Sequence, residues 1–299
     1  HVFTHSLIAY PELAYTNTDM KKRVADTLFV DFITVKEFKQ VLQALYDDGY
    51  ALVNLNDIYE EVTEDGVTKY KIKTSFEFLK GKKPFIFSFD DTNYYSSKKN
   101  MGLVDKLILK DGRVVTYTKM KDGTEIVSDD NEYVPILDRF VEEHPDFSYN
   151  GAKGMICTTG FEGVLGYRTH RILEDDTRTE ADRQAEIEAV KPVVQALKDS
   201  GWYFACHSYK HGDMSAYSGP QMQDCVTKFQ NEVTPIIGPT KIYVFPYGLY
   251  PKPEGDRPTA AHRVLLDAGF RFFCGVGVNR YVTTKPEYGN VPLQDRANI

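Results

Sequence analysis

The stretch KKPFIFSFDDTNYY, residues 82 to 95, joins a short apolar run to two adjacent acids. The run KPFIFSF predicts a buried strand, and it ends at Asp90 and Asp91. Successive side chains leave a strand on opposite faces, and two carboxylates at close range raise the pKa of one of them. The two acids must therefore diverge or be neutralised together, and a bound cation would achieve the second.

Similar apolar runs recur along the rest of the chain. We expect strands in 153–159 (KGMICTT), 202–208 (WYFACHS), 241–247 (KIYVFPY) and 270–276 (FRFFCGV). Helical periodicity predicts helices over about 34–48, 179–199, 220–237 and 258–268, the first opened by a Thr34–Glu37 capping box. Apolar strands that alternate with helices are typical of a parallel sheet buried on both faces. The sequence therefore predicts an α/β barrel, whose active site forms at the carboxyl ends of the strands.

Residues 104–130 interrupt this alternation. They contain two Asp-Gly turns, Asp111-Gly112 and Asp122-Gly123, each between alternating strand-like runs. This pattern predicts a small β-meander inserted in a βα loop, which either shapes a substrate groove or decorates the fold. No linker divides the chain, so we expect one domain over residues 1–299 with this insertion.

Composition narrows the class of protein. The 299 residues carry a net charge of −7 that is spread along the chain, which argues against a nucleic-acid partner. No apolar run is long enough to span a bilayer. The four cysteines lie far apart without CxxC spacing, so we expect free buried thiols, which leave the compartment open. The chain begins at His1, which is compatible with a leader or anchor having been trimmed.

Two histidines follow the strand expected at 202–208. The spacing of His207 and His211 would bring both imidazoles to one side of a helical turn, where they can converge on one ion. Two imidazoles with one carboxylate form the ligand set of a hydrolytic metal site, which zinc, cobalt and nickel all accept. One acid of the Asp90–Asp91 pair would then be a ligand, and the other would accept a proton from the metal-activated water.

The segment VFPYG, residues 244–248, ends a third expected strand. Pro246 and Gly248 predict a rigid turn, and the backbone N–H of Tyr247 would point into the same cleft and help to hold an oxyanion. An ordinary turn that closes a strand is the alternative.

These segments resemble the motifs of a known family. Ser88-Phe-Asp-Asp-Thr92 is similar to T/S-F-D-D-G, residues 207–211 match H-S/T-x-x-H, and VFPYG is similar to R-x-P-Y/F-G. The chain thus resembles the polysaccharide deacetylases of the NodB-homology family, carbohydrate esterase family 4. The N-terminal THSLI and the later FKQVLQALYDDGYALVNLND resemble the lead-in of secreted Gram-positive members. The resemblance spans most of the chain outside the insertion.

The resemblance implies a distorted (β/α)7 barrel and a metal-dependent hydrolase. Asp91, His207 and His211 would hold one divalent ion, most simply zinc, with Asp90 as catalytic base. The implied substrate is an N-acetylated polysaccharide such as a GlcNAc-type polymer, peptidoglycan or an exopolysaccharide, and the products are a free amine and acetate. An extracellular or cell-surface location in a Gram-positive-like bacterium follows from the same resemblance.

The chain departs from the family pattern at three places. Thr92 and Asn93 stand where a glycine is usual, and Val244 replaces the arginine that orients the base. Asp90 therefore needs another partner, for which Arg168 and Arg296 are the candidates. A late Leu-x-His motif for the general acid is also missing from the sequence. His5, in the expected first strand VFTHSLI, is our candidate for the acid, and a core histidine is the alternative.

Two other functions remain open at this stage. The same site would serve an O-acetyl esterase acting on xylan-like polymers, and a catalytically inactive sugar-binding relative would also keep the scaffold. Tyrosines flank the expected site and suit either sugar stacking or barrel packing: Tyr94, Tyr95, Tyr209 and Tyr247.

Overall fold

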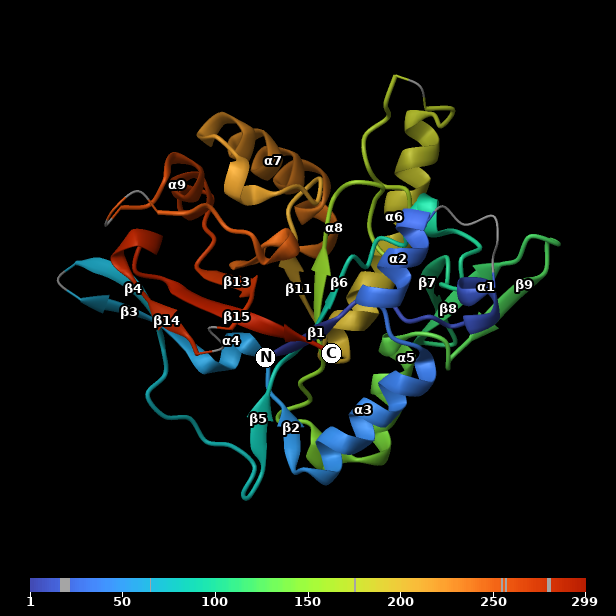
Figure 1. Ribbon diagram of the computed structural model, residues 1–299, viewed down its shortest axis with the longest axis horizontal. Coiled ribbons are helices and arrows are strands. Elements are labelled where there is room, and N and C mark those ends of the chain that lie inside the picture. Colours follow the sequence, from blue (N-terminus) through green and yellow to red (C-terminus); the bar gives the residue numbers. More distant parts are fainter. Residues whose placement is uncertain (17–21, 65, 175, 254, 256, 279–280) are drawn as a thin grey trace.

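A closed parallel barrel forms the centre of the protein in a computed structural model (Figure 1). The structure describes residues 1–16, 22–64, 66–174, 176–253, 255, 257–278 and 281–299. Within them the barrel strands lie in the order β1 (Val2–Thr4), β6 (Phe87–Asp90), β10 (Met155–Thr158), β11 (Tyr203–Cys206), β12 (Ile242–Val244), β13 (Phe272–Val276) and β15 (Pro292–Asn298). Strand β15 pairs with β1 in parallel and closes the ring, so the two termini lie side by side. The predicted (β/α)7 barrel is confirmed.

Helices surround the barrel and connect its strands. The helices are α1 (Pro11–Tyr15), α2 (Lys22–Asp31), α3 (Val35–Asp47), α4 (Leu55–Ile58), α5 (Tyr133–Glu143), α6 (Glu180–Asp199), α7 (Gly219–Glu232), α8 (Thr234–Ile237) and α9 (Ala260–Asp267). Short 3-10 turns occur at η1 (Ser96–Lys98), η2 (Pro145–Phe147), η3 (Met214–Ala216), η4 (Pro246–Gly248) and η5 (Pro286–Tyr288). The Thr34–Glu37 capping box opens α3 as the sequence predicts. None of the described helices is long and apolar enough to cross a membrane.

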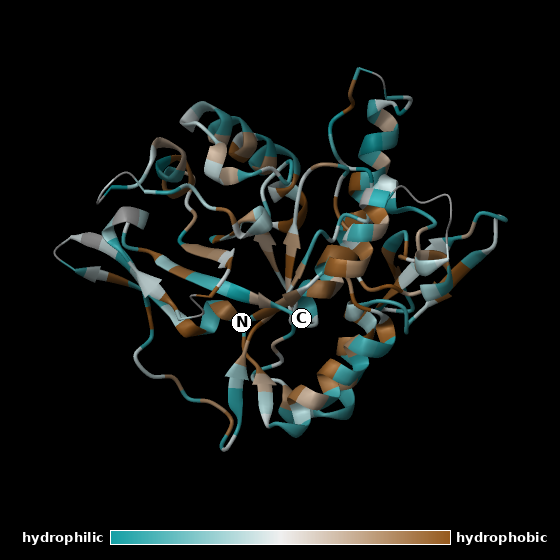
Figure 2. Cartoon of the chain, viewed as in Figure 1, coloured by the Kyte–Doolittle hydropathy of each residue, from teal (hydrophilic) through white to brown (hydrophobic). Residues whose placement is uncertain are grey.

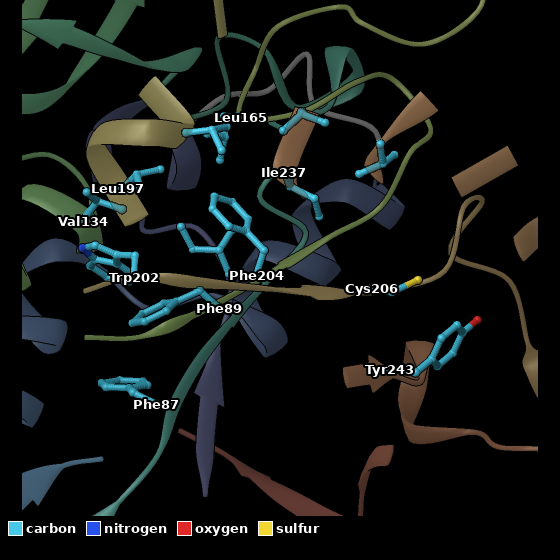
Figure 3. Packing of buried hydrophobic residues seen from close by; sticks show 14 of the residues in the cluster. Phe87, Phe89, Val134, Leu165, Leu197, Trp202, Phe204, Cys206, Ile237 and Tyr243 are labelled. Carbon is cyan, nitrogen blue, oxygen red and sulfur yellow. The ribbon is translucent and has the colours of Figure 1, made fainter. Parts of the chain in front are cut away.

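Two apolar layers hold the barrel together. Side chains that point into the barrel include Met155, Cys157 and Val244, whereas alternate residues such as Phe204 pack outward against the helices. Figure 3 shows the outer layer, in which Phe89 lies between Phe87 and Trp202. Hydropathy colouring shows apolar central strands and mixed surfaces on the outer helices (Figure 2). All four cysteines are buried and free, which confirms the expected thiols.

The expected strand at KPFIFSF is in fact two strands. β5 (Lys83–Phe85) pairs with β2 (Tyr50–Leu52) below the barrel, and β6 continues into the barrel itself. The chain changes partner at Ile86, whose carbonyl accepts from the Val2 N–H at 3.0 Å. The break therefore comes from pairing between distant segments and not from a local turn signal.

Two antiparallel sheets lie outside the barrel. The predicted meander is β7 (Lys106–Lys110), β8 (Arg113–Lys119) and β9 (Glu125–Ser128), with left-handed backbone at Asp111, Gly112 and Gly123 in its turns. A second hairpin, β3 (Tyr59–Glu64) with β4 (Val67–Ile72), was not predicted. The short strand β14 (Thr283–Thr284) lies antiparallel on β15. The meander packs against α6 and α5 (Figure 1).

Candidate active site

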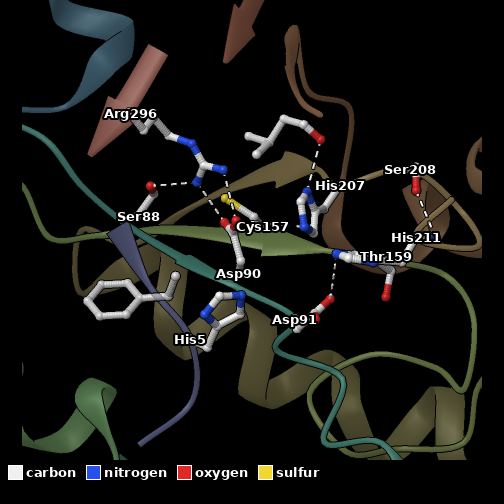
Figure 4. Close-up of polar contacts among 12 residues, drawn as sticks. His5, Ser88, Asp90, Asp91, Cys157, Thr159, His207, Ser208, His211 and Arg296 are labelled. Atoms are coloured by element: carbon white, nitrogen blue, oxygen red, sulfur yellow. Dashed lines mark hydrogen bonds and ion pairs between the residues drawn. The ribbon is translucent and has the colours of Figure 1, made fainter. Parts of the chain in front are cut away.

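The chain separates its two adjacent acids where β6 ends. Asp90 is the last strand residue, and Asp91 adopts a left-handed backbone with φ of 57°. This turn directs the Asp90 carboxylate to Arg296 and the Asp91 carboxylate toward His211 (Figure 4). The two like charges therefore have different neighbours, which answers the problem that the sequence poses.

Arg296 holds the Asp90 carboxylate with two hydrogen bonds. Its Nη1 donates to Oδ1 at 2.7 Å and its Nη2 donates to Oδ2 at 2.8 Å, and both residues are buried. Nη1 also donates to the Ser88 hydroxyl at 3.0 Å. Burial alone would raise the pKa of Asp90, but the Arg296 charge outweighs it and holds that pKa below its usual range. Asp90 is thus ionised and fixed in orientation.

His207 presents one ring nitrogen to the site. Its Nδ1 lies 2.9 Å from the carbonyl oxygen of Val244, and because a carbonyl can only accept, Nδ1 carries the proton. The Nε2 lone pair then faces the acids, 3.7 Å from Asp90 Oδ2. Burial lowers the pKa of His207 to about 4, so the ring is neutral at physiological pH, as a metal ligand must be.

His211 reaches the same point from a loop. Residues 207–211 form no helical turn, which corrects the expectation drawn from their spacing: Ser208 has φ of 63° and His211 has φ of 50°. The Ser208 hydroxyl accepts the His211 N–H at 3.0 Å and fixes this tight loop. The two imidazoles lie with ring centroids 4.9 Å apart, and His211 Nε2 is 3.7 Å from Asp91 Oδ1.

Three donor atoms converge in this way. One atom each from Asp91, His207 and His211 lies within 4.8 Å of the others, close enough to share one ion. Burial alone would raise the pKa of Asp91, but the nearby His211 reverses this and keeps the carboxyl pKa low. Two imidazole nitrogens and one carboxylate fit a divalent transition metal in chemistry as well as in spacing.

Hydrogen bonds behind the ligands position Asp91. The Tyr95 hydroxyl donates to Asp91 Oδ1 at 3.0 Å and contacts the Thr159 hydroxyl at 3.0 Å. The Nδ2 of buried Asn93 lies within hydrogen-bond distance of three carbonyl oxygens of the next barrel loop, those of Thr159, Phe161 and Gly163. The residue that stands near the usual glycine thus ties the β6 loop to the β10 loop. Sequence reasoning missed this, because the Asn93 signal was only a departure from a motif.

His5 lies close to the two acids. It follows β1, and Figure 4 places its ring beside Asp90 and Asp91. Its Nδ1 donates to the backbone carbonyl of Asp31 at 2.8 Å, and its ring stacks on Phe32. The orientation is therefore fixed, and Nε2 is the nitrogen left to exchange a proton.

The turn at Pro246 and Tyr247 lies next to His211. Tyr247 has φ of 57°, its side chain is 62% exposed, and its ring centroid is 4.6 Å from that of His211. Tyr94 and Tyr209 are buried instead, so they are packing residues and not sugar-stacking surfaces.

Of the two arginines expected near Asp90, the structure brings only Arg296 to it. Arg168 donates to the Glu162 side chain at 3.3 Å and to the Tyr94 carbonyl at 2.7 Å, away from Asp90. Arg296 lies on the last barrel strand, β15. The partner of Asp90 is therefore an arginine from a different segment of the chain than the third motif, where Val244 stands.

Comparisons with known proteins show what the chain is similar to. No curated protein matches the chain. Among solved structures, the deacetylase PplD of Streptococcus pyogenes in complex with acetate has 14% sequence identity to this chain and a TM-score of 0.47. The superposition covers 100% of this chain and 90% of the PplD chain. A proposed polysaccharide deacetylase from Mycobacterium smegmatis has 13% sequence identity and a TM-score of 0.33, and the superposition covers 55% of this chain and 44% of that protein.

The family model described as polysaccharide deacetylase matches residues 176–271, a range that includes both histidines and the 246–248 turn. The match confirms the resemblance that the motifs predict: this part of the chain is similar to the polysaccharide deacetylases.

Proposed function

We propose that the protein is a metal-dependent deacetylase that removes N-acetyl groups from a GlcNAc-type polysaccharide. One observation carries the proposal: Asp91, His207 and His211 converge on one point while Asp90, buried and ionised, lies at its edge. A structural role alone would not require four ionisable side chains at one barrel mouth.

A divalent ion held by Asp91, His207 and His211, with zinc, cobalt or nickel as candidates, would supply a Lewis acid at the acetyl carbonyl and lower the pKa of water. Asp90 accepts the proton of the attacking water, whose oxygen bonds to the carbonyl carbon. Arg296 keeps the Asp90 carboxylate in a fixed plane, at the cost of some basicity. Asp90 is therefore a well-oriented but weak base.

The remaining steps fall to His5 and the 246–248 turn. As the C–N bond breaks, the leaving nitrogen needs a proton, which protonated His5 gives from Nε2. The backbone N–H of Tyr247 would stabilise the negative oxygen that forms before this step. The products are acetate and a free amine on the sugar. We place this activity outside the cytoplasm, at the cell surface of a bacterium, where such polymers occur.

Acetate release tests the proposal and its alternatives. Wild type should release acetate from N-acetylated chitooligosaccharides or peptidoglycan faster than from acetylated xylan, and Asp90→Asn should abolish release. Asp111→Asn is the matched control, because it makes the same chemical change at an exposed left-handed turn of the meander. Preference for acetylated xylan would make the protein an esterase. Sugar binding without acetate release by the metal-loaded protein would make it an inactive relative.

A further inference from the structure

A charged cavity lies next to the candidate site. It has a volume of about 250 Å³ and is bounded by the η1 segment, the meander and the loop around Gly166. Its ionisable walls comprise five cations and one carboxylate, namely Lys98, Lys99, Lys106, Lys119, Arg168 and Asp105. A chain with a net charge of −7 has therefore gathered positive charge in one hollow.

Only part of this positive charge is neutralised by neighbouring acids. Arg168 pairs with Glu162 at 3.3 Å, and Lys119 lies 3.7 Å from Glu125. In the part of the chain that the structure describes, the ammonium groups of Lys98, Lys99 and Lys106 have no carboxylate oxygen within 4.0 Å. Asp91 and Asp31, which are not wall residues, act on Lys98 from outside the cavity. Among the wall residues themselves, these three ammonium groups outnumber the one carboxylate, Asp105.

Aromatic rings fix two of these lysines in position. The Lys106 Nζ lies 4.9 Å from the ring centre of Tyr167 and 5.3 Å from that of Tyr117. The Lys98 Nζ lies 4.3 Å from the ring centre of Phe32. Cation–π contacts hold the charge of a lysine in place without neutralising it. The cavity is therefore preorganised for an anion.

A single side chain, that of Tyr95, connects the cavity to the proposed metal ligand Asp91. Tyr95 lines the cavity, and the hydroxyl of the same residue donates to Asp91 Oδ1 at 3.0 Å. A glycan whose acetyl group lies at Asp91, His207 and His211 would have a neighbouring substituent near these lysines. Three of the wall residues, Lys106, Tyr117 and Lys119, belong to strands of the inserted meander, so the insertion contributes directly to this cavity.

We propose that this cavity binds a phosphate group carried by the polysaccharide near the sugar that is deacetylated. The inference rests on the proposed deacetylase function for its geometry. Lysine ammonium groups bind phosphate oxygens as point charges, whereas carboxylate recognition favours a free arginine fork. The arginine in this cavity is already engaged by Glu162 and by the Tyr94 carbonyl, which favours phosphate over carboxylate.

Calorimetric titration of the metal-free protein tests this without turnover. The probes are chitotetraose, the same oligomer phosphorylated at C6, and an oligomer with a carboxylate at C6. Wild type should bind the phosphorylated oligomer at least about tenfold more tightly than the neutral one, and added salt should weaken this preference. Lys99→Gln and Lys106→Gln should each reduce the preference several-fold, whereas Lys110→Gln, on the same strand as Lys106 but outside the cavity, should retain it.

Other results of these titrations would each reject one specific part of the proposal. Equal binding of the neutral and phosphorylated oligomers, or a preference that survives both cavity variants, would remove the anion site. Carboxylate bound as tightly as phosphate would remove the phosphate assignment. Lys99 is exposed and makes no ion pair among the described residues, so its variant should fold even if Lys106→Gln does not. A phosphate preference in a protein that releases no acetate would uphold the cavity and reject the deacetylase.

Discussion

Arg296 and Asp90 lie 206 positions apart and form a buried two-pronged ion pair at 2.7 and 2.8 Å. Arg296 belongs to β15, which pairs with both β1 and β13 and closes the barrel. The strand that completes the fold therefore also orients the proposed base.

Arg296→Met should lower both stability and activity. The substitution leaves the Asp90 carboxylate buried without its partner, which costs about 3–5 kcal/mol of the free energy of unfolding. Acetate release should fall by about 10²-fold or more, because the base loses its orientation. Urea unfolding and kcat report the two effects, and exposed Arg113→Met is the control.

The double variant Asp90→Asn/Arg296→Met separates these contributions. It should be more stable than Arg296→Met alone, because no unpaired charge remains in the core. Strictly additive losses in stability would show that the two side chains do not act as a pair.

His5→Gln should slow amide hydrolysis by about 10²-fold, because the leaving nitrogen loses its proton donor. The loss should be much smaller for an aryl acetate, whose leaving group departs without a proton. The ratio of kcat values for the two substrates is the measurement, with His144→Gln as the matched control. Equal losses on both substrates would assign His5 to packing against Phe32 alone.

Glu132 should make stability fall as the pH rises. Burial raises the pKa of this carboxyl to about 8 from an ordinary value of 4.5, although the N–H groups of Leu7 and Tyr133 donate to it. Between these values the folded state holds a proton that the unfolded state has lost, so the free energy of unfolding falls by at most about 1.4 kcal/mol per pH unit. The contribution is complete below pH 4.5 and is lost by about pH 8.

Glu132→Gln removes this titration and keeps an oxygen to accept the two N–H groups. Urea unfolding from acid to alkaline pH should show that the variant gains stability relative to wild type as the pH rises. Parallel profiles for the two proteins would mean that Glu132 does not titrate in this range.

The sequence predicts the apolar barrel strands well and the polar one poorly. β10 to β13 are continuous hydrophobic runs, so pattern alone locates them. β15 escapes this reasoning because Gln294, Asp295 and Arg296 are buried by polar contacts and not by hydrophobicity. From the sequence, Arg168 and Arg296 are equal candidates for the partner of Asp90, because only the closed barrel shows which of the two arginines reaches it.

Local geometry was the other limit of the sequence. The spacing of His207 and His211 is compatible with a helical turn, but left-handed backbone at Ser208 and His211 makes a loop instead. Both conformations bring two imidazoles to one side, so the ligand prediction does not depend on which of the two conformations forms. Which oxygen or nitrogen faces the proposed ion site is set by partners such as Val244 and Tyr95, which no spacing indicates.

Metal content of purified variants tests the central claim most directly. After loading with zinc and removal of free ion, wild type and Asp90→Asn should each retain about one ion per chain, while Asp91→Asn should retain far less. Both variants should fail to release acetate. An ion retained by Asp91→Asn, or lost from a folded Asp90→Asn, would contradict the division of one ligand and one base between these neighbouring acids.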